Sequence, residues 1–351
     1  MSERPALRGA SLALAAAVLF GVSTPLVQQL GSGIGAFGTA ALLYLGAALF
    51  GAASQRAVER EARLVRGDAP RLLAMAACGA VVGPVALAWG LQRTSGTGAS
   101  LMLTLEALFT ALIAWLLYRE TFDRRVAAAM GLLLLGGVAL VFDQGRAGST
   151  AVVGLLAVGA ATLAWGLDNA LSRPLAERDP GQVVMLKSAL GAAATTALAF
   201  AAREPLPAWP AALGLLAVGA TGYGLSLRFY LLAQRAFGAA RTGSVFAFAP
   251  FIGAAVALAF GDGSVGVWSA VGAVAMLAGV LMHLTERHEH AHHHEAMRHE
   301  HAHRHDDGHH GHTHPSANGA PASGVHSHPH QHEPTAHSHP HVPDAHHTHR
   351  H

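Results

Sequence analysis

The stretch FGVSTPL, Phe20–Leu26, has a counterpart in WGLDNAL, Trp165–Leu171, and this pair decides the fold. The two stretches align with a shift of 145 residues, and with a shift of 142 residues Gln92 falls on Gln234. Self-similarity at so long a period indicates that one structural unit occurs twice along the chain. We therefore expect two related halves.

The composition is that of a membrane protein. Of the 351 residues, 52% are hydrophobic and only 13% are charged, whereas soluble domains carry about 25% charged residues. An apolar run of about 20 residues can cross the bilayer as a helix, and no run has the alternating polarity of barrel strands. Ten such runs are predicted, at residues 10–30, 34–53, 70–92, 96–118, 124–142, 150–172, 182–202, 209–233, 243–260 and 265–284.

The repeat and the spans together predict the architecture. Each half has five spans, and an odd number places the halves in opposite orientation in the membrane. Inverted repeats are common in secondary transporters, whose substrate site lies between the halves near the midplane. We predict an all-α integral membrane fold of ten transmembrane helices in two inverted five-helix repeats, residues 1–142 and 150–284. A disordered tail, residues 285–351, follows them.

Arginine residues predict the orientation of the spans. One alternate set of loops holds fourteen arginines and the intervening set holds three, Arg93, Arg146 and Arg203. Because cytoplasmic loops are enriched in positive charge, we expect both termini in the cytoplasm. The fourteen are Arg4, Arg8, Arg56, Arg60, Arg63, Arg66, Arg71, Arg119, Arg124, Arg125, Arg173, Arg178, Arg235 and Arg241.

Several classes of function are disfavoured. Scattered basic residues and a net charge of +2 argue against a nucleic-acid partner. Cys78 is the single cysteine and lies in an apolar run, so it is read as a buried apolar residue. Residues 1–282 contain no histidine and no phosphate-binding glycine loop, so we expect no catalytic residues and no enzyme activity.

Three segments resemble a known family: AAAVLFGVSTPLV at Ala15, TLEALFTALIAWLLYRETFDRRVAAAMGLLLLGGVALV at Thr104, and YLLAQRAFGAARTGSVFAFAPFIGAAVALAF at Tyr230. They are similar to the repeated segments of the drug/metabolite transporter superfamily, in particular its EamA-type ten-helix members. The resemblance covers residues 8–284. It implies a bacterial inner-membrane permease, often an exporter of amino acids, metabolites or drugs, that works by alternating access.

The sequence also departs from the family pattern. The fourth helix has Ala107 or Leu108 where the family usually has a proline, while Pro250 is kept in the second half. We expect Pro25 and Pro250 to free a backbone carbonyl in mid-helix, which gives either a kink used for gating or an ordinary packing bend. Because this proline is missing, the sequence does not predict whether the fourth helix is kinked.

Ionisable residues within spans are costly, so each is a functional candidate. Glu106 lies near mid-depth and is read either as a proton-coupling or substrate-binding carboxylate or as a structural hydrogen-bond partner. Asp168 and Lys187, the only lysine, would cancel their burial costs by pairing. Arg228 either reaches the interface or binds an anionic group of the substrate.

The resemblance further implies that the first, third, fourth, sixth, eighth and ninth helices line the cavity. Glu106, Asp168 and Arg228 fall on three of them. Further residues on these helices are candidates for lining the cavity, namely Trp89, Gln92, Trp165, Tyr223 and Tyr230.

The tail has a different chemistry. Twenty-four of the 25 histidines lie between His288 and His351, and almost no large apolar residue accompanies them, so the tail cannot form a core. Neutral imidazoles at this density are ligands for Zn, Ni, Co or Cu. The first cluster comprises His288, His290, His292, His293, His294, His299, His301, His303, His305, His309, His310, His312 and His314.

The function that we predict is a secondary-active transporter, an exporter of a small metabolite or drug-like solute, with a metal-binding tail. The alternative is an efflux transporter for divalent metal, in which the tail collects or senses ions. The bundle itself needs no cofactor. The expected partners are the lipid bilayer, a small-molecule substrate and divalent metal ions, and a homodimer is left open.

Overall fold

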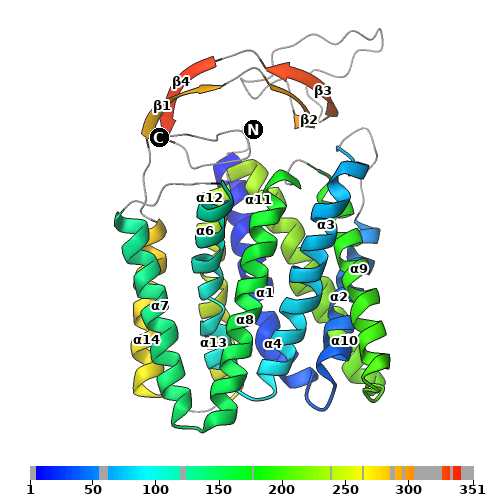
Figure 1. Ribbon diagram of the computed structural model, residues 1–351, viewed down its shortest axis with the longest axis vertical. Helices are drawn as coiled ribbons and strands as arrows, with labels where there is room; N and C mark the ends of the chain where they lie inside the picture. Colours follow the sequence, from blue (N-terminus) through cyan, green and yellow to red (C-terminus); the bar gives the residue numbers. More distant parts are fainter. Residues whose placement is uncertain are drawn as a thin grey trace.

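The fold is taken from a computed structural model. It describes residues 5–54, 62–118, 124–175, 178–237, 239–262, 265–284, 289–294, 297–303, 326–332 and 335–340. Helices run side by side in one bundle, and the strands of the tail lie beyond the end of the bundle at which α1 begins (Figure 1). We call that end the tail end and the other the distal end.

The first repeat begins with α1 (Pro5–Leu30) and α2 (Ala36–Ala53). Its third span is composite and its fourth is split in two. The third consists of η2 (Arg66–Asp68), α3 (Ala69–Met75), the π-helical segment η3 (Ala76–Val82) and α4 (Gly83–Leu91). The fourth consists of α5 (Gly96–Met102) and α6 (Leu105–Tyr118), and the fifth is α7 (Arg124–Gly145).

The second repeat has the same pattern. It begins with α8 (Ser149–Ser172), the short η4 (Arg173–Leu175) and α9 (Pro180–Ala201). Its third span consists of α10 (Trp209–Val218), the π-helical η5 (Gly219–Leu225) and α11 (Ser226–Phe237). Its last two spans are the split α12 (Ala239–Phe246) and α13 (Ala249–Ala259), and α14 (Val267–Leu284).

The predicted number of spans is confirmed. Among the described residues, eight helical segments are long and apolar enough to cross a membrane, and two shorter apolar helices, Ala249–Ala259 and Val267–Met282, complete the ten. The outside of the bundle exposes large apolar side chains, among them Leu116, Phe142 and Val274. Such an apolar surface suits a bilayer and would be a liability in water.

Irregular backbone recurs at matching places in the two repeats. The π-helical segments Ala76–Val82 and Gly219–Leu225 each have seven residues and lie 143 positions apart. The split of the fourth span after Met102 likewise matches the split after Phe246. Because these irregularities occupy the same places in both halves, they belong to the repeated unit.

The fourth span breaks without a proline. Thr104 N–H bonds to the Leu101 carbonyl and Glu106 N–H to the Leu103 carbonyl, so this turn is tightened to the 3₁₀ pattern. Pro250 lies in the first turn of α13, just after the matching break, and not in the middle of a helix. The span is thus interrupted directly before Pro250 and is not bent within one continuous helix. Pro25 lies inside α1.

Equivalent helices of the two repeats pack against each other. The closest associations are α2 with α9 and α7 with α14, and α1 packs against α11 and α13 as α8 packs against α4 and α6. Small residues allow the close approach, since a Cβ at Gly219 would collide with the carbonyl of Leu43. The core therefore lies at the interface between the repeats, around α1 and α8.

The described parts of the tail are short segments beyond the bundle. They form β1 (Glu289–His294), β2 (Met297–His303), β3 (His326–His332) and β4 (Thr335–Pro340). The strands pair antiparallel, β1 with β4 and β2 with β3. Such pairing satisfies backbone hydrogen bonds without a hydrophobic core, which composition alone does not reveal.

Candidate functional site

A buried ion pair joins the first two helices of the second repeat. Asp168 on α8 and Lys187 on α9 are each about 5% exposed, and the ammonium group contacts Oδ2 of the carboxylate. The predicted pairing is confirmed, and it offsets the cost of burying either charge alone. Among the described residues, the second oxygen, Oδ1, has no hydrogen-bond partner.

Glu106 is linked to this pair through one neighbouring side chain. It lies in the first turn of α6 and accepts a 2.6 Å hydrogen bond from Nδ2 of Asn169, which follows Asp168 on α8. Glu106 keeps part of its surface accessible, whereas Asp168 is buried. The two carboxylates therefore belong to one polar cluster between α6, α8 and α9, in which Glu106 is the accessible member.

Aromatic side chains from both repeats pack together beside the cluster. Phe20 on α1 meets Trp165 on α8 edge to face, with ring centroids 6.0 Å apart, and meets Tyr223 at 5.8 Å. Phe20 and Trp165 are the residues that the internal repeat aligns, so this contact lies where the halves meet. Phe246 on α12 lies 5.4 Å from Phe20 and 5.0 Å from Tyr230.

The π-helical segment η3 supplies a carbonyl to this region. Tyr44 Oη and Trp165 Nε1 both donate to the carbonyl oxygen of Gly79, the latter at 2.9 Å. Position 79 must be glycine, because a Cβ there would collide with the carboxylate of Asp168. The irregular turn thus brings an aromatic pair and a buried carboxylate to one point.

Three other candidates lie toward the ends of helices. Arg228 donates from Nη1 to the carbonyl of Ser54, just after α2 ends. Trp89 has the Arg93 guanidinium 3.7 Å above its ring. Exposed Gln92 donates to the carbonyl of Ile34 at 2.8 Å. The structure therefore does not bring these three together with the polar cluster.

Several residues in and beside the polar cluster were not predicted as site residues. Asn169, Tyr44, Phe20 and Phe246 carry no charge, so their span positions alone give no signal. Phe20 could have been found, because it opens the quoted FGVSTPL repeat and aligns with Trp165.

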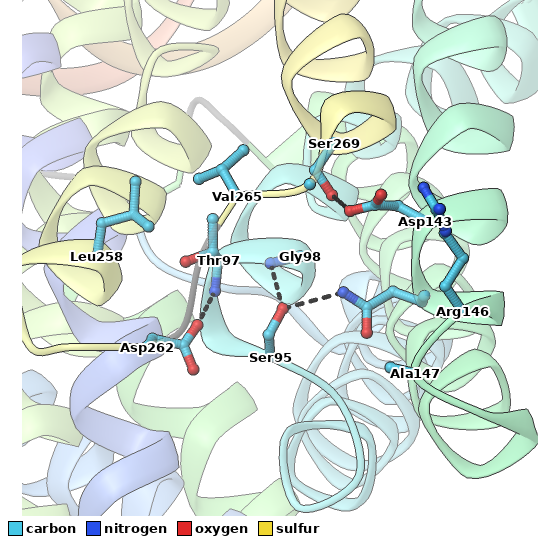
Figure 2. A pocket seen from close by; sticks show the side chains of 12 residues that line it. Ser95, Thr97, Gly98, Asp143, Arg146, Ala147, Leu258, Asp262, Val265 and Ser269 are labelled. Carbon is cyan, nitrogen blue, oxygen red and sulfur yellow. Dashed lines mark hydrogen bonds between the residues drawn. The ribbon is translucent and has the colours of Figure 1, made fainter.

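A second polar region lies at the distal end, where α5, α7, α13 and α14 enclose a cavity of about 430 Å³ (Figure 2). Asp262 accepts a 2.6 Å hydrogen bond from the backbone N–H of Thr97, and Asp143 accepts one from the hydroxyl of Ser269. Both bonds join the first repeat to the second. Gln144 donates to the hydroxyl of Ser95, which caps α5.

The described residues contain no group of three or more His, Cys, Asp or Glu side chains that could hold a metal ion. The side chains from His283 onward lie outside the described part of the structure, so metal binding by the tail stays a prediction.

Comparisons with known proteins agree with this architecture. The EamA-like transporter family matches residues 7–142 and 152–285. An uncharacterized transporter of Methanothermobacter thermautotrophicus is 31% identical over 238 residues, which are 66% of this chain and 68% of that protein. A protein crystal structure with 18% identity and a TM-score of 0.59 covers 78% of this chain and 94% of its own, and shares the fold.

The two family matches each cover one five-helix repeat, and together they include the polar cluster and the aromatic contacts. The chain therefore belongs to the EamA-like transporter family of the drug/metabolite transporter superfamily and is a multi-pass membrane transporter.

Proposed function

We propose that the protein is a secondary-active exporter of a small metabolite or drug-like solute that works by alternating access between its two repeats. The observation that carries the proposal is the carboxylate of Glu106, a partly exposed residue, hydrogen-bonded to Asn169 beside the Asp168–Lys187 pair. Ionisable groups within membrane spans face cavities and mark substrate or proton pathways. A carboxylate between two repeats can change its surroundings when the repeats move.

Glu106 is proposed as the coupling group, which exchanges a proton or the solute as the transporter changes state. Asp168 and Lys187 neutralise each other, and we assign them the role of holding α8 against α9 and of positioning Asn169. Trp165, Tyr223 and Tyr230 would contribute the apolar wall of the substrate site, since aromatic rings offer large rigid contact surfaces.

For orientation, we propose that the tail end faces the cytoplasm of a bacterium and that the bundle lies in the inner membrane. The arginine count supports this assignment, since Arg66, Arg71 and Arg124 lie in the arginine-rich loops at the tail end and Arg93, Arg146 and Arg203 at the distal end. The distal cavity then lies on the extracytoplasmic side.

The tail is proposed to bind divalent metal. In the register of β2 and β3, His299 pairs with His330, His301 with His328 and His303 with His326. The tail carries 24 of the 25 histidines, and neutral imidazoles are ligands for Zn, Ni, Co or Cu. This density of histidine also favours the second candidate function, export of Zn, Ni, Co or Cu with the tail as collector.

The coupling role is tested with purified protein in liposomes, where a pH-sensitive dye reports proton movement when solutes from an amino-acid, amine and drug panel are added. Glu106→Gln keeps the hydrogen bond to Asn169 but cannot carry a proton, so solute-dependent proton flux should vanish. Glu204→Gln is the matched control, because Glu204 caps α2 through the N–H groups of Phe37 and Gly38. Undiminished flux in Glu106→Gln would refute the assignment.

The metal alternative is tested by elemental mass spectrometry of cells that express the full chain, a chain ending at Arg287, or neither. If the full chain lowers cellular Ni, Co, Zn or Cu and truncation abolishes that effect at equal expression, metal export replaces export of an organic solute. If the full chain only raises bound metal, the tail stores or senses metal.

A further inference from the structure

Three hydroxyl groups, two on α5 and one in the turn between α5 and α6, lack the partners that buried hydroxyls normally have. Thr97, Ser100 and Thr104 are exposed by 6%, 0% and 2%. Within the described residues, none of their side-chain oxygens has a hydrogen-bond partner. Buried polar groups are nearly always satisfied, so unsatisfied ones call for an explanation such as bound water.

The three hydroxyls lie along one line. Positions three residues apart share a helix face, so Thr97 and Ser100 lie on one face of α5, and Thr104 follows in the turn between α5 and α6. We call these three residues the hydroxyl face. At 1.5 Å per residue this face is about 10 Å long. Its inner end coincides with the break of the fourth span, two residues before Glu106.

The outer end of the hydroxyl face opens on the distal cavity, because Thr97 is one of its lining residues (Figure 2). The cavity is polar, with Asp143, Asp262 and the exposed Arg146 on its walls. A polar cavity of this size holds water. The hydroxyl face therefore begins at a hydrated pocket.

Between its ends, at Ser100, the hydroxyl face lies against one glycine of the other repeat. A Cβ at Gly253 on α13 would lie 2.9 Å from the Ser100 hydroxyl and 2.8 Å from the carbonyl of Gly21 on α1. This contact between α1, α5 and α13 is close but makes no hydrogen bond through Ser100. If α5 moved away from α1 and α13, the hydroxyl groups would be exposed to water, and no hydrogen bond of these hydroxyls would be broken.

We propose that the distal cavity is the extracytoplasmic mouth of the transport path, and that the hydroxyl face lines the path from this mouth to the break in the fourth span. The inference rests on the proposed alternating access. In the structure the path is closed, with Gly253 against Ser100. When the repeats separate, water and then the solute pass along the three hydroxyls.

Two hydrogen bonds between the repeats hold the mouth closed. The Asp262 carboxylate accepts from the N–H of Thr97 at the start of the hydroxyl face, and Asp143 accepts from Ser269. A hydrogen bond to a charged group is stronger than one between neutral groups. Asp262→Asn should therefore weaken the closure and increase the time for which the path is open.

The test is labelling of single cysteines by a positively charged, membrane-impermeant methanethiosulfonate added to intact cells. Cys78→Ala supplies the background, since Cys78 is the only cysteine. Ser100→Cys and Thr104→Cys should react from outside at least about tenfold faster than Ala99→Cys. Ala99 is the matched control, being 0% exposed on the opposite side of the same helix. Asp262→Asn should speed the reaction of Ser100→Cys by about fivefold, from the loss of about 1 kcal/mol of closure.

The outcomes separate this inference from the proposed function. If both cysteines react no faster than Ala99→Cys, or react only in inverted vesicles, the path does not run along α5, whereas proton flux through Glu106 would still stand. If Ser100→Cys does not fold, Thr97→Cys and Thr104→Cys carry the same test, with gel filtration as the folding control. Arg146→Cys places a cysteine in the wall of the distal cavity. If it also reacts from outside faster than Ala99→Cys, the result supports the distal cavity as the mouth.

Discussion

Removing the ammonium group of Lys187 tests how much the buried ion pair contributes to the fold. The side chains of Lys187 and Asp168 are 6% and 7% exposed, and the pair links α8 to α9. Lys187→Met keeps the length and the packing of the side chain but leaves the carboxylate without its cation. No described residue offers Oδ1 of Asp168 a compensating bond.

The magnitude follows from the burial of the pair. Breaking a buried ion pair by removing one partner costs about 3–5 kcal/mol, while replacing both partners by neutral groups of similar shape is nearly neutral. A double variant replaces both partners of the pair. Because Gly79 packs directly against the Asp168 carboxylate, its second substitution must keep the shape of the side chain, and Asp168→Asn does so. Lys187→Met should therefore lower Tm by on the order of 10 °C, and the double variant should recover most of that loss.

The assay is thermal unfolding of the detergent-solubilised protein, followed by gel filtration after heating at fixed protein concentration. Arg146→Met is the control, because Arg146 is exposed and surface changes are worth about 0.5 kcal/mol or less. Two results would refute the reasoning: a Tm of Lys187→Met within 2 °C of the parent, or a double variant as unstable as the single variant.

Three further predictions concern the packing and the tail. Gly79→Ala should reduce the yield of folded protein severalfold, because its Cβ meets Asp168, whereas Gly67→Ala should not, because nothing lies within 4 Å of a Cβ there; equal yields would contradict this. Trp165→Phe removes one of two side-chain donors to the Gly79 carbonyl and should lower the free energy of unfolding by about 1 kcal/mol. The double variant with Tyr44→Phe removes both side-chain donors, so its loss of Tm should exceed the sum of the two single losses. Ending the chain at Arg287 should abolish Zn binding by the purified protein and leave Tm unchanged; Zn retained by the shortened chain would place the metal in the bundle.

The arrangement of the bundle was largely predictable, because hydropathy and repeat are local properties of the chain. A span of 20 apolar residues must be helical in a bilayer whatever surrounds it, so the number of spans follows directly. The two residues that this shift aligns, Phe20 and Trp165, also contact each other in the structure. The Asp168–Lys187 pair was predictable for a similar reason, since a single buried lysine needs a carboxylate at its own depth.

The site itself depended on contacts that sequence does not encode locally. No residue near Leu103 predicts a break in the helix, since the proline that the family usually has there is absent. In the structure the helix breaks at this point, and the backbone N–H groups of Thr104 and Glu106 form 3₁₀ hydrogen bonds. Arg228 was expected near the interface or in a cavity, and its bond to the Ser54 carbonyl joins helices that lie 174 positions apart.

Amino-acid sequence by itself determined that this protein is a duplicated ten-helix membrane bundle with a histidine-rich tail, because burial in lipid acts on each span separately. Only the tertiary structure decided that Glu106 accepts a hydrogen bond from Asn169, that the Gly79 carbonyl accepts from Tyr44 and Trp165, and that the hydroxyl of Ser100 lies against Gly253. Each of these contacts joins different helices, and which faces meet depends on how small residues let the two repeats pack.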